Sequence, residues 1–235
     1  MTALVLENIE VRYGQARAVA GVSLTVEAGR WTALIGANGA GKTSLLRAAV
    51  GLVRHGGRVI IDGHDVSRLP PWQRQRHGFG FVPEGRQTFT QMTVEENLRV
   101  GGYTCAPAEL RRGLEAAYAL FPRLAERRAQ LASTMSGGEQ QMLALARALM
   151  TQPKLLLVDE ISWGLMPILV TQVFAHLATL HAAGVAILQV EQNAHEVLRH
   201  AEVAHVMSAG EIVLAGRAAD IARDPRVVES YVGKV

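Results

Sequence analysis

The chain has 235 residues, 49% of them hydrophobic and 19% charged, so the composition is that of a globular protein with one large domain or a core with one insert. Basic residues number 24 against 21 acidic ones and are scattered, which argues against a nucleic-acid binder. The single cysteine, Cys105, excludes an intrachain disulfide. No run of roughly 18 apolar residues occurs and the N-terminus lacks a signal-peptide pattern, so we expect neither a membrane span nor a leader.

The N-terminal third predicts strands around one helix. Alternating or compact apolar segments indicate strands at residues 4–12, 24–27, 31–35 and 58–61. A helix is expected at residues 42–50, directly after a glycine-rich loop and before a terminating glycine.

The middle of the chain, residues 87–149, changes character. Helical spacing predicts helices at 93–103, 108–121 and 137–150, with Pro107 and Pro122 at their boundaries, and strand signals are few. This segment therefore predicts a helical subdomain inserted into a core formed by residues 1–86 and 150–235.

The last third returns to alternating strands and helices. Continuous apolar runs predict buried strands at 155–159 and 185–190, separated by a helix at 168–183, and a hairpin at 203–208 and 211–214. The tail from Arg217 is expected to be short and helical. The whole chain thus predicts a single α/β domain with a mainly parallel sheet covered on both faces.

A phosphate-binding loop is the most specific motif. Residues 36–43 (GANGAGKT) match G-x-x-x-x-G-K-[ST] between a predicted strand and a predicted helix. The glycines let successive N–H groups point at phosphate oxygens, and the helix adds its positive N-terminal end. Lys42 supplies a mobile charge for the β- and γ-phosphates, and Thr43 places a hydroxyl on Mg²⁺. The residues expected to bind Mg·ATP are Gly36, Ala37, Asn38, Gly39, Ala40, Gly41, Lys42, Thr43 and Ser44.

Two carboxylates end the apolar strand at 155–159. Charge at a buried strand tip is unfavourable unless it meets a ligand. Asp159 is placed to hold Mg²⁺, and Glu160 is then free to polarise the attacking water as a general base. An ordinary strand that leads into an acidic loop is the alternative, and the phosphate loop makes it the weaker one.

A serine and two glycines open the predicted helix at 137–150. Ser136 and Glu139 have the spacing of a capping box. Adjacent glycines, Gly137 and Gly138, cost about 1 kcal/mol each relative to alanine inside a helix, so they suit a backbone that approaches a ligand closely. A helix start with a serine hydroxyl is an anion site, although in one subunit it need not reach the phosphate loop.

In their order and spacing the three motifs resemble those of ABC transporter ATP-binding subunits over essentially the whole chain. The resemblance implies a P-loop NTPase core with an antiparallel β subdomain and the inserted helical subdomain. It also implies a head-to-tail dimer with two ATP molecules between the subunits. Ser136, Gly137, Gly138 and Gln140 of one subunit would then contact the nucleotide held by the other. Tyr13 matches the aromatic residue that stacks on adenine, with an exposed strand-end tyrosine as the alternative.

A narrower resemblance concerns residues 82–86 (VPEGR), 92–98 (MTVEENL) and 190–193 (VEQN), which are similar to the ATP-binding subunits of branched-chain amino acid importers. It implies an ATP-hydrolysing motor at the cytoplasmic face of the membrane, peripheral through permease subunits. A second ATPase chain, identical or different, and indirectly an extracytoplasmic substrate-binding protein complete the assembly.

Several alternatives stay open at this point. Urea, amides or other amino acids are alternative substrates. An ABC protein acting on nucleic acid or ribosomes typically needs a coiled-coil insert or a second cassette, and neither is present, so no nucleic-acid partner is expected. A regulatory nucleotide sensor would not need the carboxylate of Glu160.

Three positions and one short segment depart from the general family pattern. Glu84 stands where glutamine is usual and is expected to reach Mg²⁺. Gln192 replaces a histidine; it can donate a hydrogen bond to the γ-phosphate but carries no positive charge, so it is expected to position rather than to act as an acid. Ile161 replaces a proline, and residues 163–166 (WGLM) replace a segment ending in aspartate within a loop that crosses the dimer interface. His195 is expected on a helix surface.

Overall fold

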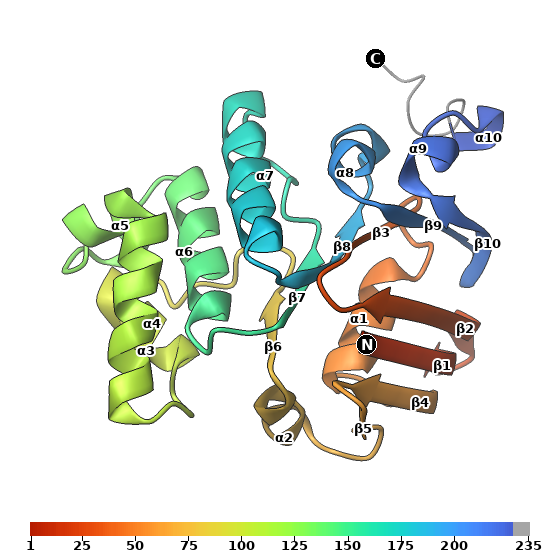
Figure 1. Ribbon diagram of the computed structural model, residues 1–235, viewed down its shortest axis with the longest axis horizontal. Coiled ribbons are helices and arrows are strands. Elements are labelled where there is room, and N and C mark those ends of the chain that lie inside the picture. Colours follow the sequence, from red (N-terminus) through yellow and green to blue (C-terminus); the bar gives the residue numbers. More distant parts are fainter. Residues whose placement is uncertain (228–235) are drawn as a thin grey trace.

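The structure is a computed structural model and describes residues 1–227 (Figure 1). Its centre is a six-stranded sheet in the order β10-β9-β3-β8-β7-β6. Neighbouring strands from β9 to β6 are parallel, and β10 pairs antiparallel with β9. The strands are β3 (Trp31–Ile35), β6 (Phe79–Val82), β7 (Leu155–Asp159), β8 (Ala186–Glu191), β9 (Val203–Ser208) and β10 (Glu211–Arg217).

Burial on both faces explains the sequences of the central strands. Every residue of β3, β7 and β8 is buried, which matches their nearly continuous apolar runs. The predicted bounds of β3 and β7 are confirmed, and the predicted strand at 185–190 is shifted by one residue. All three strands end at the same edge of the sheet, because they run parallel.

A second, antiparallel sheet has the order β2-β1-β4-β5. Its strands are β1 (Thr2–Tyr13), β2 (Ala16–Glu27), β4 (Gly56–Ile61) and β5 (His64–Asp65). The prediction of a short strand at 24–27 is wrong in length, because β2 begins at Ala16. The register of β1 against β2 shifts near Asn8, which has φ of 51°, and Gly21 of β2 has φ of 77°. Such an irregularity breaks the alternation that the sequence pattern relies on.

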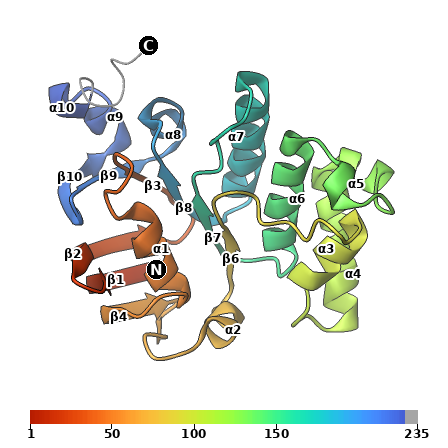
Figure 2. The ribbon, with the colours of Figure 1, turned by 180° about the vertical axis from the view of Figure 1, so that it is seen from behind.

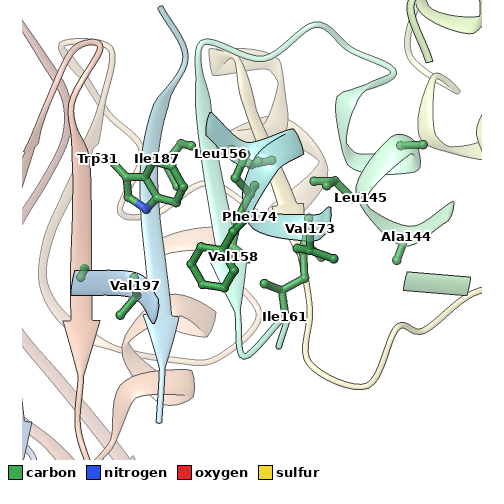
Figure 3. Close-up of a cluster of buried hydrophobic side chains, with 14 of the residues drawn as sticks. Trp31, Ala144, Leu145, Leu156, Val158, Ile161, Val173, Phe174, Ile187 and Val197 are labelled. Carbon is green, nitrogen blue, oxygen red and sulfur yellow. The ribbon is translucent and has the colours of Figure 1, made fainter. Parts of the chain in front are cut away.

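Helices cover both faces of the central sheet. Helix α1 (Lys42–Val50) packs against β1, β2 and β7, between the two sheets. Helices α7 (Pro167–Ala182) and α8 (Ala194–His200) lie on the opposite face, where Trp31, Phe174 and Ile187 belong to one buried apolar cluster (Figure 3). The sheet is therefore enclosed, as the apolar strands predict.

A group of helices lies beside the sheet at the β6 and β7 side (Figures 1 and 2). It contains α3 (Val94–Gly101), α4 (Pro107–Leu120), α5 (Pro122–Glu126) and α6 (Gly137–Leu149). The remaining short helical elements are α2 (Pro71–Arg74), η1 (Gln75–His77), η2 (Ala132–Thr134), α9 (Ala218–Ile221) and α10 (Pro225–Val227). The helices predicted in the middle of the chain are present with ends that differ by one or two residues. The α/β fold class with its mainly parallel sheet is confirmed.

Strand β6 was not predicted from the sequence. Its four residues include Gly80, whose backbone passes so close to α6 that an added Cβ would lie 2.5 Å from the carbonyl oxygen of Ala148. Glycine in a strand often marks such a close approach and weakens the strand signal. Within residues 1–227, no helix has both the length and the apolar character needed to cross a membrane.

The cluster around Phe174 should dominate stability at the α7 face. Phe174 is 2% exposed, and its ring stacks 6.3 Å from that of Trp31. We expect Phe174→Ala to lower the free energy of unfolding by about 3–5 kcal/mol, because it removes a fully buried aromatic side chain. Urea denaturation of the nucleotide-free chain measures this. Ile168→Ala, on the same helix but 63% exposed, is the matched control and should change stability by less than about 0.5 kcal/mol. Equal losses in the two variants would contradict the assignment.

Candidate active site

The loop between β3 and α1 is shaped by glycines at two close approaches. Gly41 has φ of 103°, and an added Cβ there would collide with the carbonyl oxygen of Ala18. At Gly36 it would collide with the carbonyl oxygen of Met207. The loop borders a pocket of about 460 Å³. The pocket is lined by Ala18, Asn38, Gly39, Gly41, Lys42, Thr43, Ser44, Glu84, Glu160 and Trp163.

Lys42 is held in place by three oxygen acceptors. Its ammonium donates to the carbonyl oxygens of Gly36 at 2.9 Å and Ala37 at 3.2 Å. It also forms an ion pair with Glu160 at 3.1 Å, and the two side chains are 3% and 9% exposed. The structure thus holds this charge where the sequence predicted a mobile side chain.

Glu160 reaches Lys42 from a strained backbone. Its φ is 44°, in the left-handed region, which costs a non-glycine residue about 1–3 kcal/mol. Its N–H donates to the carbonyl oxygen of Val190 at 2.9 Å, so β8 holds the residue in place. Strain of this kind concentrates at functional sites.

Thr43 and Asp159 converge next to this ion pair. The Thr43 hydroxyl donates to Oδ1 of Asp159 at 3.1 Å. Burial raises the pKa of Asp159 to about 6; the Thr43 hydrogen bond opposes this shift, whereas the charges of Glu160 and Glu84 add to it. A hydroxyl and carboxylates are the oxygen ligands that Mg²⁺ takes, so Thr43, Asp159 and Glu84 fit that ion.

Tyr13 lies at the end of β1, beside the start of α1. Its hydroxyl accepts a hydrogen bond from the Ser44 hydroxyl at 3.4 Å, and the residue is about half exposed. An exposed aromatic ring therefore flanks the phosphate loop outside the pocket.

The segment that begins α6 is a capping box. The Ser136 hydroxyl accepts from the Glu139 N–H at 3.3 Å, and the Glu139 carboxylate accepts from the Ser136 N–H at 2.9 Å. An added Cβ would lie 2.8 Å from the Arg86 guanidinium at Gly137 and 2.5 Å from the Leu169 side chain at Gly138. At both positions the neighbour is the far end of a flexible side chain, so an added Cβ would require that side chain to move.

The same segment does not reach the phosphate pocket. None of Ser136, Gly137, Gly138 and Gln140 is among the residues that line it. The Gln140 amide is turned inward and donates to the carbonyl oxygen of Ala132 at 2.9 Å. One chain therefore presents the two predicted halves of the site at separate places.

Residues 191–195, at the end of β8 and after it, are not among those that line the pocket, and the role expected for Gln192 stays a prediction. Gln192 is exposed and does not line the pocket. His195 lies exposed on α8, as predicted. Glu191, which we had not singled out, is 1% exposed and accepts hydrogen bonds from the Ser162 hydroxyl at 2.7 Å and the Gln189 amide at 3.0 Å. The signal for it was a carboxylate and an amide within an otherwise apolar strand.

Comparisons with known proteins agree with this geometry. Residues 19–162 match the family described as ABC transporter. The chain is 42% identical over 98% of its length, and 99% of the relative's, to the high-affinity branched-chain amino acid transport ATP-binding protein BraG of Pseudomonas aeruginosa. It is 35% identical over its full length, and 98% of the relative's, to the lipopolysaccharide export system ATP-binding protein LptB of Haemophilus influenzae. Among solved structures, the ADP conformation of MJ1267, an ATP-binding cassette of an ABC transporter, superposes with a TM-score of 0.85 at 31% identity, covering all of both chains.

Glu191 should make stability depend on pH. Burial raises its pKa from 4.5 to about 7, so the folded chain binds more protons than the unfolded chain between these values. Stability therefore falls as pH rises from about 4.5 and levels off above about 7. Glu191→Gln cannot ionise, so we expect it to lack this component. Its free energy of unfolding relative to that of the native chain should rise by about 2.5 kcal/mol between pH 5 and pH 8. Urea denaturation at a series of pH values measures this; Glu202→Gln is the control, and parallel curves for Glu191→Gln and the native chain would contradict the assignment.

Proposed function

Because the chain belongs to the ABC transporter family and is an ATPase that couples ATP hydrolysis to transmembrane transport, we propose that it is the motor subunit of a branched-chain amino acid importer. ATP hydrolysis is supported by one observation: four side chains converge at the glycine-rich loop, namely those of Lys42, Thr43, Asp159 and Glu160. The substrate class rests on the similarity to BraG along nearly the whole chain. Similarity to LptB, a relative named for lipopolysaccharide export, makes an export system the competing function.

In the proposed mechanism, ATP binding first breaks the ion pair between Lys42 and Glu160. The loop amides and the N-terminal end of α1 bind the phosphates. The γ-phosphate replaces Glu160 as the ion-pair partner of the Lys42 ammonium. The Glu160 carboxylate is then free to accept a proton from the attacking water. The water oxygen bonds to the γ-phosphorus as the bond to the β,γ-bridging oxygen breaks, and ADP leaves. Mg²⁺ held by Thr43, Asp159 and Glu84 would neutralise phosphate charge.

A second ATPase subunit completes the proposed site. Ser136, Gly137 and Gly138 lie away from the phosphate loop of their own chain, so we assign them to the nucleotide bound by the partner. Gln140 shapes this segment through its bond to Ala132. Tyr13 stacks on adenine, and Gln192 donates a hydrogen bond to the γ-phosphate once the dimer closes. ATP then joins the two subunits and hydrolysis releases them.

An apolar groove is the proposed docking site for a permease subunit. It encloses about 430 Å³ between the β6–α2 region and helices α3 and α6. Trp72 is 63% exposed at the groove, and Leu52 and Phe89 are also exposed. Exposed large apolar side chains gathered at one groove mark interaction sites. Phe89 lies five residues after Glu84, so an occupant of the groove would touch the chain segment that lines the phosphate pocket. We therefore propose that docking to permease subunits through this groove holds the chain at the cytoplasmic face of the membrane.

Glu160 should control hydrolysis more strongly than Gln192. We expect Glu160→Gln to lower turnover by at least about 100-fold, because it removes the general base, while ATP binding persists. Gln192→Ala removes one hydrogen bond to phosphate and should cost about 10-fold. Phosphate release with permease present measures both, and Glu196→Gln on α8 is the control. Near-normal turnover in Glu160→Gln would overturn the base assignment.

Transport is tested in the source organism. We expect deletion of the gene to abolish uptake of labelled leucine, isoleucine and valine, and the native chain to restore it. Trp72→Ala should reduce restored uptake about 10-fold or more, because an aromatic anchor is lost from the groove, yet leave the ATPase rate of the isolated chain unchanged. Val213→Ala, exposed on β10, is the control. Loss of urea or amide uptake, or of lipopolysaccharide export, in place of amino acid uptake would refute the proposed substrate.

A further inference from the structure

A buried chain of hydrogen bonds runs beneath the candidate active site. The Trp31 indole donates to Oε1 of Gln189 at 3.1 Å, and the Gln189 amide nitrogen donates to Oε1 of Glu191 at 3.0 Å. The Ser162 hydroxyl donates to Oε2 of Glu191 at 2.7 Å, and the Ser162 N–H donates to Oε1 at 3.3 Å. The Glu191 carboxylate thus receives three hydrogen bonds from two segments of the chain.

The positions of these residues relate them to hydrolysis. Ser162 is two residues after Glu160, and Glu191 immediately precedes Gln192. Trp31 begins β3, the strand that leads into the phosphate loop. The hydrogen-bonded chain therefore joins the three segments that carry the proposed phosphate-binding and catalytic groups.

Packing alone gives no reason for a carboxylate at this position. Glu191 is buried within β8, and the charged group that faces it, Glu160, is paired with Lys42. Burying a carboxylate costs free energy that an apolar side chain of similar volume would not. The carboxylate instead fixes the orientation of Ser162, because its two oxygens accept hydrogen bonds from both the hydroxyl and the N–H of that residue.

The segment that Glu191 holds needs such support. Glu160 has φ of 44°, and the Trp163 N–H donates to its carbonyl oxygen at 3.1 Å to close a tight turn. A left-handed glutamate persists only when surrounding contacts impose it. Ser162 lies in this turn, two residues after Glu160, and its hydrogen bonds to Glu191 hold the turn in place.

We propose that Glu191 is a positioning residue for ATP hydrolysis: through Ser162 it holds the turn that aims Glu160, and through β8 it fixes the start of the Gln192 loop. This inference rests on the roles proposed above for Glu160 and Gln192. It requires hydrogen bonds in a defined geometry and not the negative charge. Glutamine can reproduce them, with its oxygen accepting at the Oε1 place and its amide donating to the Ser162 hydroxyl.

The test compares four variants of the purified full-length chain, at a concentration where turnover no longer rises with concentration. We expect Glu191→Ala to lower kcat about 10- to 100-fold with KM for ATP within about twofold, because a small misplacement of the base slows the chemical step and not binding. Ser162→Ala should show a smaller loss of the same kind, and the double variant should equal Glu191→Ala. Glu191→Gln should retain kcat within about threefold.

Glu202→Ala is the matched control. This carboxylate also accepts from a backbone N–H, that of Trp31 at 2.9 Å, but at the end of β3 remote from the phosphate loop. It should leave kcat unchanged. The proposal is overturned if Glu191→Ala keeps kcat within twofold, if Glu191→Gln is as slow as Glu191→Ala, or if Glu202→Ala loses as much. Glu160→Gln in the same assay separates this failure from failure of the base assignment.

Amide hydrogen exchange tests the contact independently of turnover. We expect Glu191→Ala to speed exchange by at least about 10-fold at two N–H groups: that of Glu160, which is bonded to Val190 of β8, and that of Trp163, which is bonded to Glu160 within the turn. Glu191→Gln and Glu202→Ala should leave these two sites protected. Unchanged protection in Glu191→Ala would overturn the proposal even where the turnover of every variant is too slow to rank.

Discussion

The buried ion pair between Lys42 and Glu160 joins the phosphate loop to the end of β7, and the candidate site is arranged around this contact. Two charges in so enclosed a place are each costly, and removing one partner of such a pair typically costs about 3–5 kcal/mol. They neutralise one another until phosphate replaces the carboxylate at Lys42. In the proposed mechanism the substrate therefore activates the base, because the same charge that binds the γ-phosphate restrains Glu160 in its absence.

The elements that sequence alone predicted well are those whose environment is uniform. Strands β3 and β7 are buried on both faces, so their apolar runs mark their ends to the residue, and glycines bound α1 at both ends. Strand β6 could not be recognised in the same way. Its Gly80 is required by the close approach of the Ala148 carbonyl, which lies 68 residues further along the chain. The first half of β2 was not predicted for a related reason. Its pairing with β1 contains register shifts that interrupt the alternating pattern of a regular strand.

The site shows the same division between local spacing and distant contact. Lys42, Thr43, Asp159 and Glu160 follow from motifs whose spacing is read along the chain, and the structure gathers them at one pocket. The restraint on Lys42 could not be predicted, since its carboxylate partner lies 118 residues further on. Glu191 was within reach of sequence reasoning, because a carboxylate in a fully buried apolar strand demands a partner. That partner, Ser162, only the fold could supply.

The proposed division of the site between two chains gives the exposed residues near the pocket a physical role. Trp163 lines the phosphate pocket and is 62% exposed, and Met166 and Ile168, at the start of α7, are exposed to a similar degree. An apolar surface of this kind beside a charged pocket is stabilised when a partner covers it, and aromatic side chains dominate such contacts. In the proposed dimer this surface adjoins the pocket that receives the partner's Ser136 segment. Covering Trp163 would exclude water from the same pocket in which Glu160 must act, so association and hydrolysis depend on one surface.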